Sequence, residues 1–225
     1  FNMNKINNTS VVKQQYANAN NLNTRISIHD KYSTNKMGFG NWIMSNYRID
    51  EKMKVLELGC GTGDMWKNSQ SLIKACSKLN ETFDVVIANM MLYHVPDIDK
   101  GLNEVRRVLK KGGHFYCATY GEHGIIEYLS KILSEYGVQN NINKNFTLQN
   151  GYVILSKTFS KVDKLEYIDS LAVTNVDEMI DYIYSQSSMT TLNDVPKHII
   201  KDVLMQNMTN GILNVPKEYG MFVAS

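Results

Sequence analysis

The stretch Val55-Leu56-Glu57-Leu58-Gly59-Cys60-Gly61-Thr62-Gly63 decides the fold that this sequence predicts. Its first half is mostly apolar, as a short buried strand requires, and its second half has glycine at every other position. Because glycine has no Cβ, the backbone N–H groups of such a loop can approach a ligand closely at the start of a helix. The stretch therefore predicts a strand, a ligand-binding turn and a helix in succession.

Apolar patterns after this loop continue the alternation of strands and helices. Residues 83–88 carry the β-branched density of a buried parallel strand, and residues 98–109 repeat apolar side chains at helical spacing, with Lys111-Gly112-Gly113 as the expected helix end. The remaining expected elements are helices at 22–29, 66–79, 125–136 and 176–184 and strands at 114–120, 164–168 and 221–224. This order indicates an α/β fold with a doubly wound, mostly parallel sheet.

The length and the even composition of the chain predict one domain. A chain of 225 residues can bury one substantial α/β core, and no repeat or linker divides it. We predict residues 1–50 as an N-terminal helical cap or lid and residues 51–225 as the core. The prolines are expected in loops; they are Pro96, Pro196 and Pro216.

The charge and the cysteine content argue against several classes of partner. The 24 basic and 22 acidic residues are spread along the chain and leave a net charge of +2, so no basic block indicates nucleic-acid binding. No apolar run of about 18 residues predicts a membrane helix. Three cysteines inside expected elements fit a reducing compartment. We expect a cytoplasmic protein with a small-molecule substrate, no nucleic-acid or membrane partner and no metal, whose oligomeric state the sequence leaves open.

The glycine spacing distinguishes between cofactors. A dinucleotide fingerprint needs its third glycine one position later, where this chain has Asp64, and a carboxylate there would repel a pyrophosphate. The zwitterionic amino-acid end of S-adenosylmethionine suits the loop better, because Glu57 can accept hydrogen bonds from it. The predicted cofactor-binding residues of the loop are therefore Glu57, Gly59, Cys60 and Gly61. A nucleotide-dependent oxidoreductase is the disfavoured alternative.

Three motifs in order resemble the class I S-adenosylmethionine-dependent methyltransferases, in the small-molecule branch that includes uncharacterised bacterial members. They are the glycine loop, Asn89-Met90-Met91-Leu92-Tyr93-His94-Val95-Pro96-Asp97, and Glu104-Val105-Arg106-Arg107-Val108-Leu109-Lys110-Lys111-Gly112-Gly113. The resemblance implies a Rossmann-like fold, S-adenosylmethionine as cofactor and methyl transfer to a small molecule or metabolite. It also implies that Asn89 and Met90 lie under the cofactor, and that residues 16–42 form a lid, which adds Tyr16 to the cofactor-binding residues.

One departure from this family lies between the glycine loop and residue 83. Family members normally have two more strands there, and the first ends in an acid that binds the ribose hydroxyls. Residues 64–82 have room for one helix and no strand, so the adenosine contacts have no match. Either the strands are deleted, or this sequence lacks a segment between about residues 79 and 83 that orders when cofactor binds. A direct right-handed crossover would force the linking helix onto the other face of the sheet, which favours the second explanation.

The sequence leaves the catalytic group open. Methyl transfer depends mainly on positioning, with a base only where the acceptor must lose a proton. His29, Tyr32 and His94 are the candidate catalytic residues, with surface or packing roles as the alternative. Arg25 lies four residues before His29 on the same face of an expected helix and is a candidate partner of the cofactor carboxylate. The residues expected either to shape the pocket or merely to pack are Trp42, Tyr47 and Trp66. His123 follows the strand at 114–120, where doubly wound folds open their ligand crevice, and is a candidate substrate-site residue.

A second class of function stays open because of the missing strands. A methyltransferase-like module that has lost its adenosine site would act by binding or regulation and not by catalysis. A measurement of S-adenosylmethionine binding distinguishes the methyltransferase from such a module.

Overall fold

The structure, a computed structural model, describes residues 19–59, 80–186 and 191–225. Contacts divide the chain into two compact units. Unit 1 comprises Phe1–Gly38, Glu122–Asn143 and Ile168–Glu218, and unit 2 comprises Phe39–Gly121, Lys144–Tyr167 and Tyr219–Ser225. The predictions for Tyr16, Cys60, Gly61, Trp66 and the helix at 66–79 lie outside the described residues.

The described part of the predicted cap, residues 19–50, contributes a helix to each unit. Helix α2 (Ala19–Tyr32) belongs to unit 1, and helix α3 (Phe39–Asn46) belongs to unit 2. Helix α2 contains the helix predicted at 22–29, whereas α3 lies in the part of the cap for which no separate helix was predicted. The division of the chain into one domain with a cap and a core stays a prediction.

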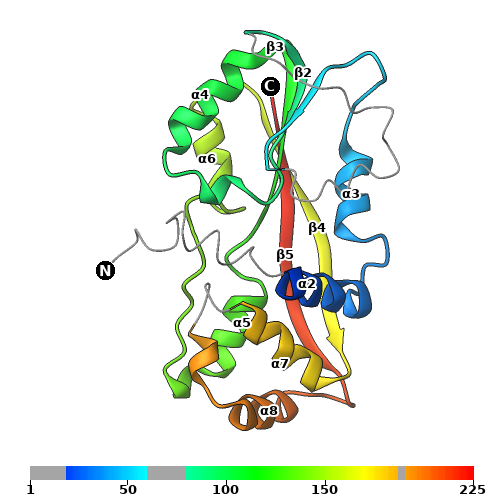
Figure 1. The fold of residues 1–225 in the computed structure, drawn as a ribbon, viewed down its shortest axis with the longest axis vertical. Coiled ribbons are helices and arrows are strands. Elements are labelled where there is room, and N and C mark those ends of the chain that lie inside the picture. Colours follow the sequence, from blue (N-terminus) through cyan, green and yellow to red (C-terminus); the bar gives the residue numbers. More distant parts are fainter. Residues whose placement is uncertain (1–18, 60–79, 187–190) are drawn as a thin grey trace. The chain divides into compact units, whose positions relative to one another are not determined.

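In the described part of the chain, five strands form one sheet in the order β1-β2-β3-β5-β4 (Figure 1). The strands are β1 (Val55–Glu57), β2 (Phe83–Ile87), β3 (Leu109–Tyr120), β4 (Val162–Val173) and β5 (Leu213–Ala224). β1 pairs with β2 and β2 with β3 in parallel, whereas β3 pairs with β5 antiparallel. The sheet is thus mixed, and the predicted α/β class is confirmed.

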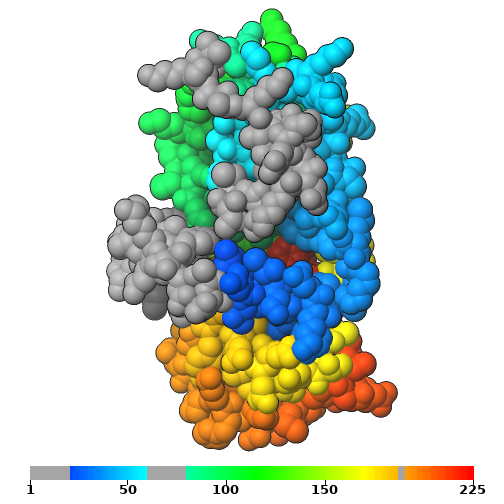
Figure 2. All heavy atoms as spheres, turned by 45° about the vertical axis from the view of Figure 1, so that its right-hand side comes forward, coloured from blue at the N-terminus to red at the C-terminus, as the bar shows by residue number. Residues whose placement is uncertain are grey.

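The two faces of the sheet in unit 2 carry separate cores, because side chains alternate along each strand. Val85, Ile87 and Tyr116 are buried on the face that α3 covers. On the other face, Val86 and Phe115 are buried in the second core. The helices on that side are α4 (Ile98–Val108) and α6 (Gly151–Leu155), opposite α3 in Figure 1. Figure 2 shows α3, in light blue, on the outer surface of unit 2.

Helix α4 and strand β3 correct one sequence prediction. The helix begins at the N-cap Asp97, whose side chain accepts a hydrogen bond from the Lys100 N–H, and ends at Val108, because Leu109 is already extended. Gly112, predicted as a helix cap, instead lies inside β3 with φ +74°, at an irregularity in the pairing with β2. Gly112 therefore forms part of a β-bulge, where the left-handed conformation is one that glycine adopts more easily than other residues do. The prediction for Pro216 is also wrong, since this residue lies exposed within β5 and not in a loop.

Unit 1 is built from helices around the ends of β4 and β5. Its helices are α2, α5 (Ile125–Ile132), α7 (Val176–Ser185) and α8 (Lys197–Gln206), with short 3-10 turns at Ser134–Tyr136 and Leu192–Asp194. The Tyr32 hydroxyl donates to Glu178 over 2.9 Å and so joins α2 to α7.

A buried ion pair ties the end of α2 to both long strands within unit 1. Lys217 of β5 pairs with Asp169 of β4, and the two side chains are only 3% and 0% exposed. The Lys217 ammonium also donates to the Ser33 hydroxyl over 2.7 Å. The Asp169 carboxylate accepts the Asn35 N–H over 2.9 Å as well. These bonds satisfy both charges, which burial would otherwise make unfavourable.

None of the helices in the described ranges has the length and apolar character needed to cross a membrane.

Candidate cofactor site

The candidate site lies where β1 and β2 end, in unit 2. The parallel register places Glu57 beside Ile87, and the Leu58 N–H donates to the Ile87 carbonyl over 2.8 Å. Asn89 follows two residues after Ile87. Because side chains alternate along a strand, Glu57 and Ile87 share the face that α3 covers. The ends of adjacent parallel strands are the usual ligand position in such sheets, so the structure brings the predicted residues of both motifs together.

Gly59 is required at the turn after β1 for two reasons. Its φ of +71° lies in the left-handed region, and a Cβ there would lie 3.2 Å from both Cβ and Cγ of Met91. The glycine thus lets the end of β1 pack against the turn after β2. Nothing in the sequence pattern distinguished Met91 from its neighbours, and its packing on Gly59 was missed.

Met90 occupies an unusual backbone conformation at the turn after β2. Its φ is +52°, and its N–H donates to the Ala118 carbonyl of β3 over 2.8 Å. A left-handed conformation costs a non-glycine residue about 1–2 kcal/mol. Such strain persists where the surroundings hold it and is enriched at functional sites. The backbone of Met90 therefore marks the same turn that the sequence predicts under the cofactor.

The carboxamide of Asn89 is held at both ends. Its Nδ2 donates to the Tyr47 hydroxyl over 2.5 Å, and its Oδ1 accepts the Ala118 N–H over 3.3 Å. Tyr47 follows α3 directly, and its ring packs edge-on against Tyr116 with 4.9 Å between ring centroids. Of the aromatic residues that were expected either to pack or to shape the pocket, Tyr47 is thus the one that reaches the predicted site in the described chain.

The environment of Tyr47 keeps its hydroxyl neutral. Burial raises the pKa of Tyr47 well above its usual value, and the negative charge of Glu57 raises it further. The site therefore combines one carboxylate with a neutral pair, Tyr47 and Asn89.

His94 lies in the 3-10 turn η4 (Leu92–His94) that follows Met91. Among the described residues neither of its buried ring nitrogens has a hydrogen-bond partner. Burial also lowers the pKa of His94, so the ring is neutral near pH 7. A neutral imidazole with a free nitrogen is the form that acts as a general base.

The three candidates on α2 have structural contacts within unit 1. Arg25 donates from Nε to the Asn21 carbonyl over 3.1 Å, and Tyr32 is buried with its hydroxyl on Glu178. The His29 ring packs edge-on against Tyr182 at 5.9 Å, and burial, helped by the charge of Lys217, lowers its pKa to about 4. Packing accounts for these contacts, and the roles of Arg25, His29 and Tyr32 toward cofactor or acceptor stay predictions.

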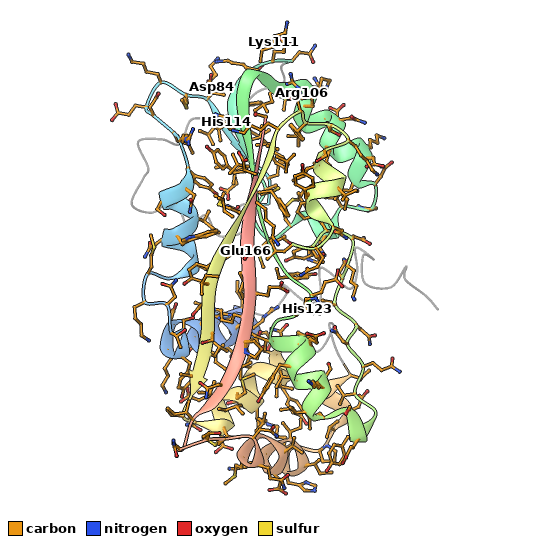
Figure 3. The ribbon with its side chains drawn as sticks, turned by 180° about the vertical axis from the view of Figure 1, so that it is seen from behind. Asp84, Arg106, Lys111, His114, His123 and Glu166 are labelled. Carbon is orange, nitrogen blue, oxygen red and sulfur yellow. The ribbon has the colours of Figure 1, made fainter. Side chains whose placement is uncertain are left out.

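The other residues singled out in the sequence lie elsewhere. Trp42 stacks on Phe39 at 5.9 Å and packs in unit 2. His123, in unit 1, is exposed and lies 3.1 Å from Glu127, whose carboxylate raises its pKa. A charged group that includes Asp84 and Lys111 gathers near the starts of β2 and β3 (Figure 3). This group is at the amino end of β2, whereas Asn89 follows its carboxyl end.

The residues present fit the amino-acid end of S-adenosylmethionine. Glu57 supplies an acceptor for an ammonium group, and the left-handed Gly59 gives a turn without a side chain beside it. Within residues 19–59, 80–186 and 191–225, no group of three or more His, Cys, Asp or Glu side chains is placed to hold a metal ion.

Comparison with known proteins gives one family match and several similar folds. Residues 70–117 match the family model of the methyltransferase domain. No curated protein matches the chain significantly. The fold is similar to that of a methyltransferase from an antibiotic biosynthesis pathway of Anabaena variabilis, with 11% identity and a TM-score of 0.51 over 83% of this chain and 96% of that one. It is also similar to Haemonchus contortus phosphoethanolamine N-methyltransferase 2 in complex with S-adenosyl-L-methionine, with 15% identity and a TM-score of 0.50 over 96% of this chain and 59% of that one.

Proposed function

The resemblance to the class I S-adenosylmethionine-dependent methyltransferases is confirmed by the family match and the fold, and from that premise we propose that this chain transfers a methyl group to a small-molecule acceptor. The observation that carries the proposal is the meeting of two turns at the ends of β1 and β2. Gly59 is left-handed in the first turn and Met90 in the second, with Glu57 and Asn89 beside them. The second turn does not have this conformation by local preference, since Met90 is strained.

Each residue at this site has a defined task in the proposed reaction. When bound, S-adenosylmethionine supplies an electrophilic methyl group on a sulfonium. Glu57 would bind the ammonium of the amino-acid end, and the turn at Asn89 and Met90 would hold the cofactor in position. His94, neutral near pH 7, accepts a proton from an acceptor that must lose one. The chain thus contributes mainly by positioning.

We propose that the acceptor is a free metabolite in the cytoplasm. The balanced charge of +2 supports an acceptor other than nucleic acid. The Haemonchus relative, whose fold is similar, is named for an N-methyltransferase of phosphoethanolamine, a small molecule. Incubation with S-adenosylmethionine and a panel of amines, acids, phenols and thiols should give S-adenosylhomocysteine with one of them.

Isothermal titration with S-adenosylhomocysteine tests the cofactor assignment directly. The wild-type protein is expected to bind. Gly61→Val is expected to abolish binding, because it places a branched side chain in the glycine loop. No binding by the full-length wild-type protein would refute the proposal.

A second candidate is a methyltransferase-like module that binds without catalysis. The observation in its favour is that the 64–82 stretch has no room for the strands that normally hold the adenosine. Binding of S-adenosylhomocysteine without methyl transfer to any acceptor in the panel would favour this candidate.

A further inference from the structure

We infer that Tyr47 is a positioning residue of the cofactor site, whose hydroxyl fixes the carboxamide of Asn89 and thereby the turn beneath the cofactor. The inference rests on the proposed function and adds to it a residue from outside the strand ends. Tyr47 directly follows α3, in the segment that precedes the glycine loop.

The bonds of Asn89 make its orientation depend on Tyr47. Its Nδ2 donates to the Tyr47 hydroxyl over 2.5 Å, and its Oδ1 accepts the Ala118 N–H over 3.3 Å. N–H···O bonds usually span about 2.7–3.2 Å, so the bond to Tyr47 is the closer contact and the bond from Ala118 is a long one. Without the Tyr47 hydroxyl, the carboxamide loses its close contact and is less restrained about its terminal torsion.

The same contacts link Asn89 to the strained turn. Ala118 donates its N–H to Asn89 and accepts the N–H of Met90 over 2.8 Å, so the two residues and β3 form one connected group. Tyr47 adds the third bond to this group. Because Met90 holds a left-handed backbone, loss of a neighbouring bond lets the turn relax toward an unstrained form.

Tyr47 also interacts with the residue at the end of β1. Its hydroxyl accepts a hydrogen bond from the Asn89 carboxamide and experiences the charge of Glu57. The Glu57 carboxylate is close enough to raise the pKa of this hydroxyl, as burial does to a larger extent. The neutral Tyr47 hydroxyl thus interacts both with Glu57 of the glycine-loop motif and with Asn89 of the motif at 89–97.

Tyr47 is itself well fixed. Its ring lies edge-on against the fully buried Tyr116 at 4.9 Å. The next residue, Arg48, donates its N–H to the Tyr116 hydroxyl over 3.1 Å. The segment after α3 is therefore attached to the sheet by two tyrosine hydroxyls, of which only that of Tyr47 contacts Asn89.

A double-mutant cycle with S-adenosylhomocysteine as the probe tests the inference. Titration calorimetry compares the wild-type protein with Tyr47→Phe, Asn89→Ala and the double variant. Tyr47→Phe keeps the ring and removes one buried hydrogen bond, so we expect the Kd to rise about three- to tenfold. If Tyr47 acts through Asn89, adding Tyr47→Phe to Asn89→Ala should change the Kd less than about twofold.

Tyr116→Phe is the matched control. It removes the neighbouring hydroxyl, which tethers Arg48 and does not contact Asn89, and it should leave the Kd within about twofold. Thermal melting without ligand verifies that each variant is folded. Equal losses in Tyr47→Phe and Tyr116→Phe would assign the effect to tethering of the segment and overturn the inference, as would an unchanged Kd in Tyr47→Phe. Absence of binding by the wild-type protein would overturn the proposed function itself and this inference with it.

Discussion

Gly59→Ala tests whether the turn after β1 needs glycine for both its backbone and its contacts. At φ +71° a Cβ costs about 1–2 kcal/mol, as in any left-handed position. The new Cβ would also lie 3.2 Å from two carbons of Met91, so Met91 must shift by a few tenths of an ångström. Forcing an extra carbon into packed surroundings costs typically about 1–3 kcal/mol, and a small shift belongs at the low end. We expect the free energy of unfolding to fall by about 2–4 kcal/mol.

Gly112→Ala separates these two costs. Gly112 has φ +74° and belongs to the same unit, but among the described residues other than its chain neighbours no atom lies within 4 Å of the position that a Cβ would take there. Its substitution should therefore cost only the backbone strain of about 1–2 kcal/mol. Urea denaturation of both variants gives the difference, which measures the contact with Met91.

The same pair of variants should differ in cofactor binding. Gly59→Ala moves Met91, which follows directly on Met90, and we expect the Kd for S-adenosylhomocysteine to rise at least tenfold. Gly112 lies near the start of β3, whereas the residue of β3 that bonds Asn89 and Met90 is Ala118. Gly112→Ala should leave the Kd unchanged. Equal destabilisation of both variants together with equal binding would refute the packing of Met91 on Gly59 as a determinant of the site.

Two further predictions concern unit 1. Lys217→Met leaves the buried Asp169 carboxylate without its cation, and the free energy of unfolding should fall by about 3–5 kcal/mol. The exposed pair Lys201 and Asp177 provides the control, since Lys201→Met should cost at most about 1 kcal/mol; similar losses in urea denaturation would contradict the assignment. Burial, and secondarily Lys217, lowers the pKa of His29 from 6.5 to about 4, so the unfolded chain binds more protons between these values. The stabilisation from neutral His29 is therefore present above pH 6.5 and declines by about 3 kcal/mol as the pH falls to 4. In His29→Gln this part of the pH dependence of unfolding should disappear, and a persisting slope of the same size would show that His29 is not its source.

The sequence predicts the strand ends of the site well because the relevant signals are local. Glycine spacing after Val55 and Leu56 indicates a turn, and the β-branched run at 83–88 indicates the neighbouring strand. In the structure these become β1 and β2, paired in parallel as the resemblance implies. The positions of Glu57, Gly59, Asn89 and Met90 then follow from the ends of those strands.

Features that depend on distant contacts could not be predicted in this way. Tyr47 and Asn89 are 42 positions apart, and nothing in the pattern around Tyr47 separates it from Trp42, which only packs. Gly112 has the sequence signature of a helix cap, but the pairing of β3 with β2 determines its actual role. Likewise the apolar pattern predicts a strand only at 221–224, whereas β5 begins at Leu213. Pairing within the sheet extends the strand into residues that are not apolar enough to be recognised from the sequence.

The order of strands has a consequence for biosynthesis. β5 lies between β3 and β4, although it is the last described strand to leave the ribosome. Until residues 213–224 emerge, β3 and β4 of a nascent chain have no central partner, and the edge of β3 that β5 will occupy is open from Phe115 to Tyr120. Such an apolar open edge can pair with other chains. Translation that pauses before β5 should therefore leave a chain dependent on chaperones, and loss of these last residues should prevent folding of the sheet as a whole.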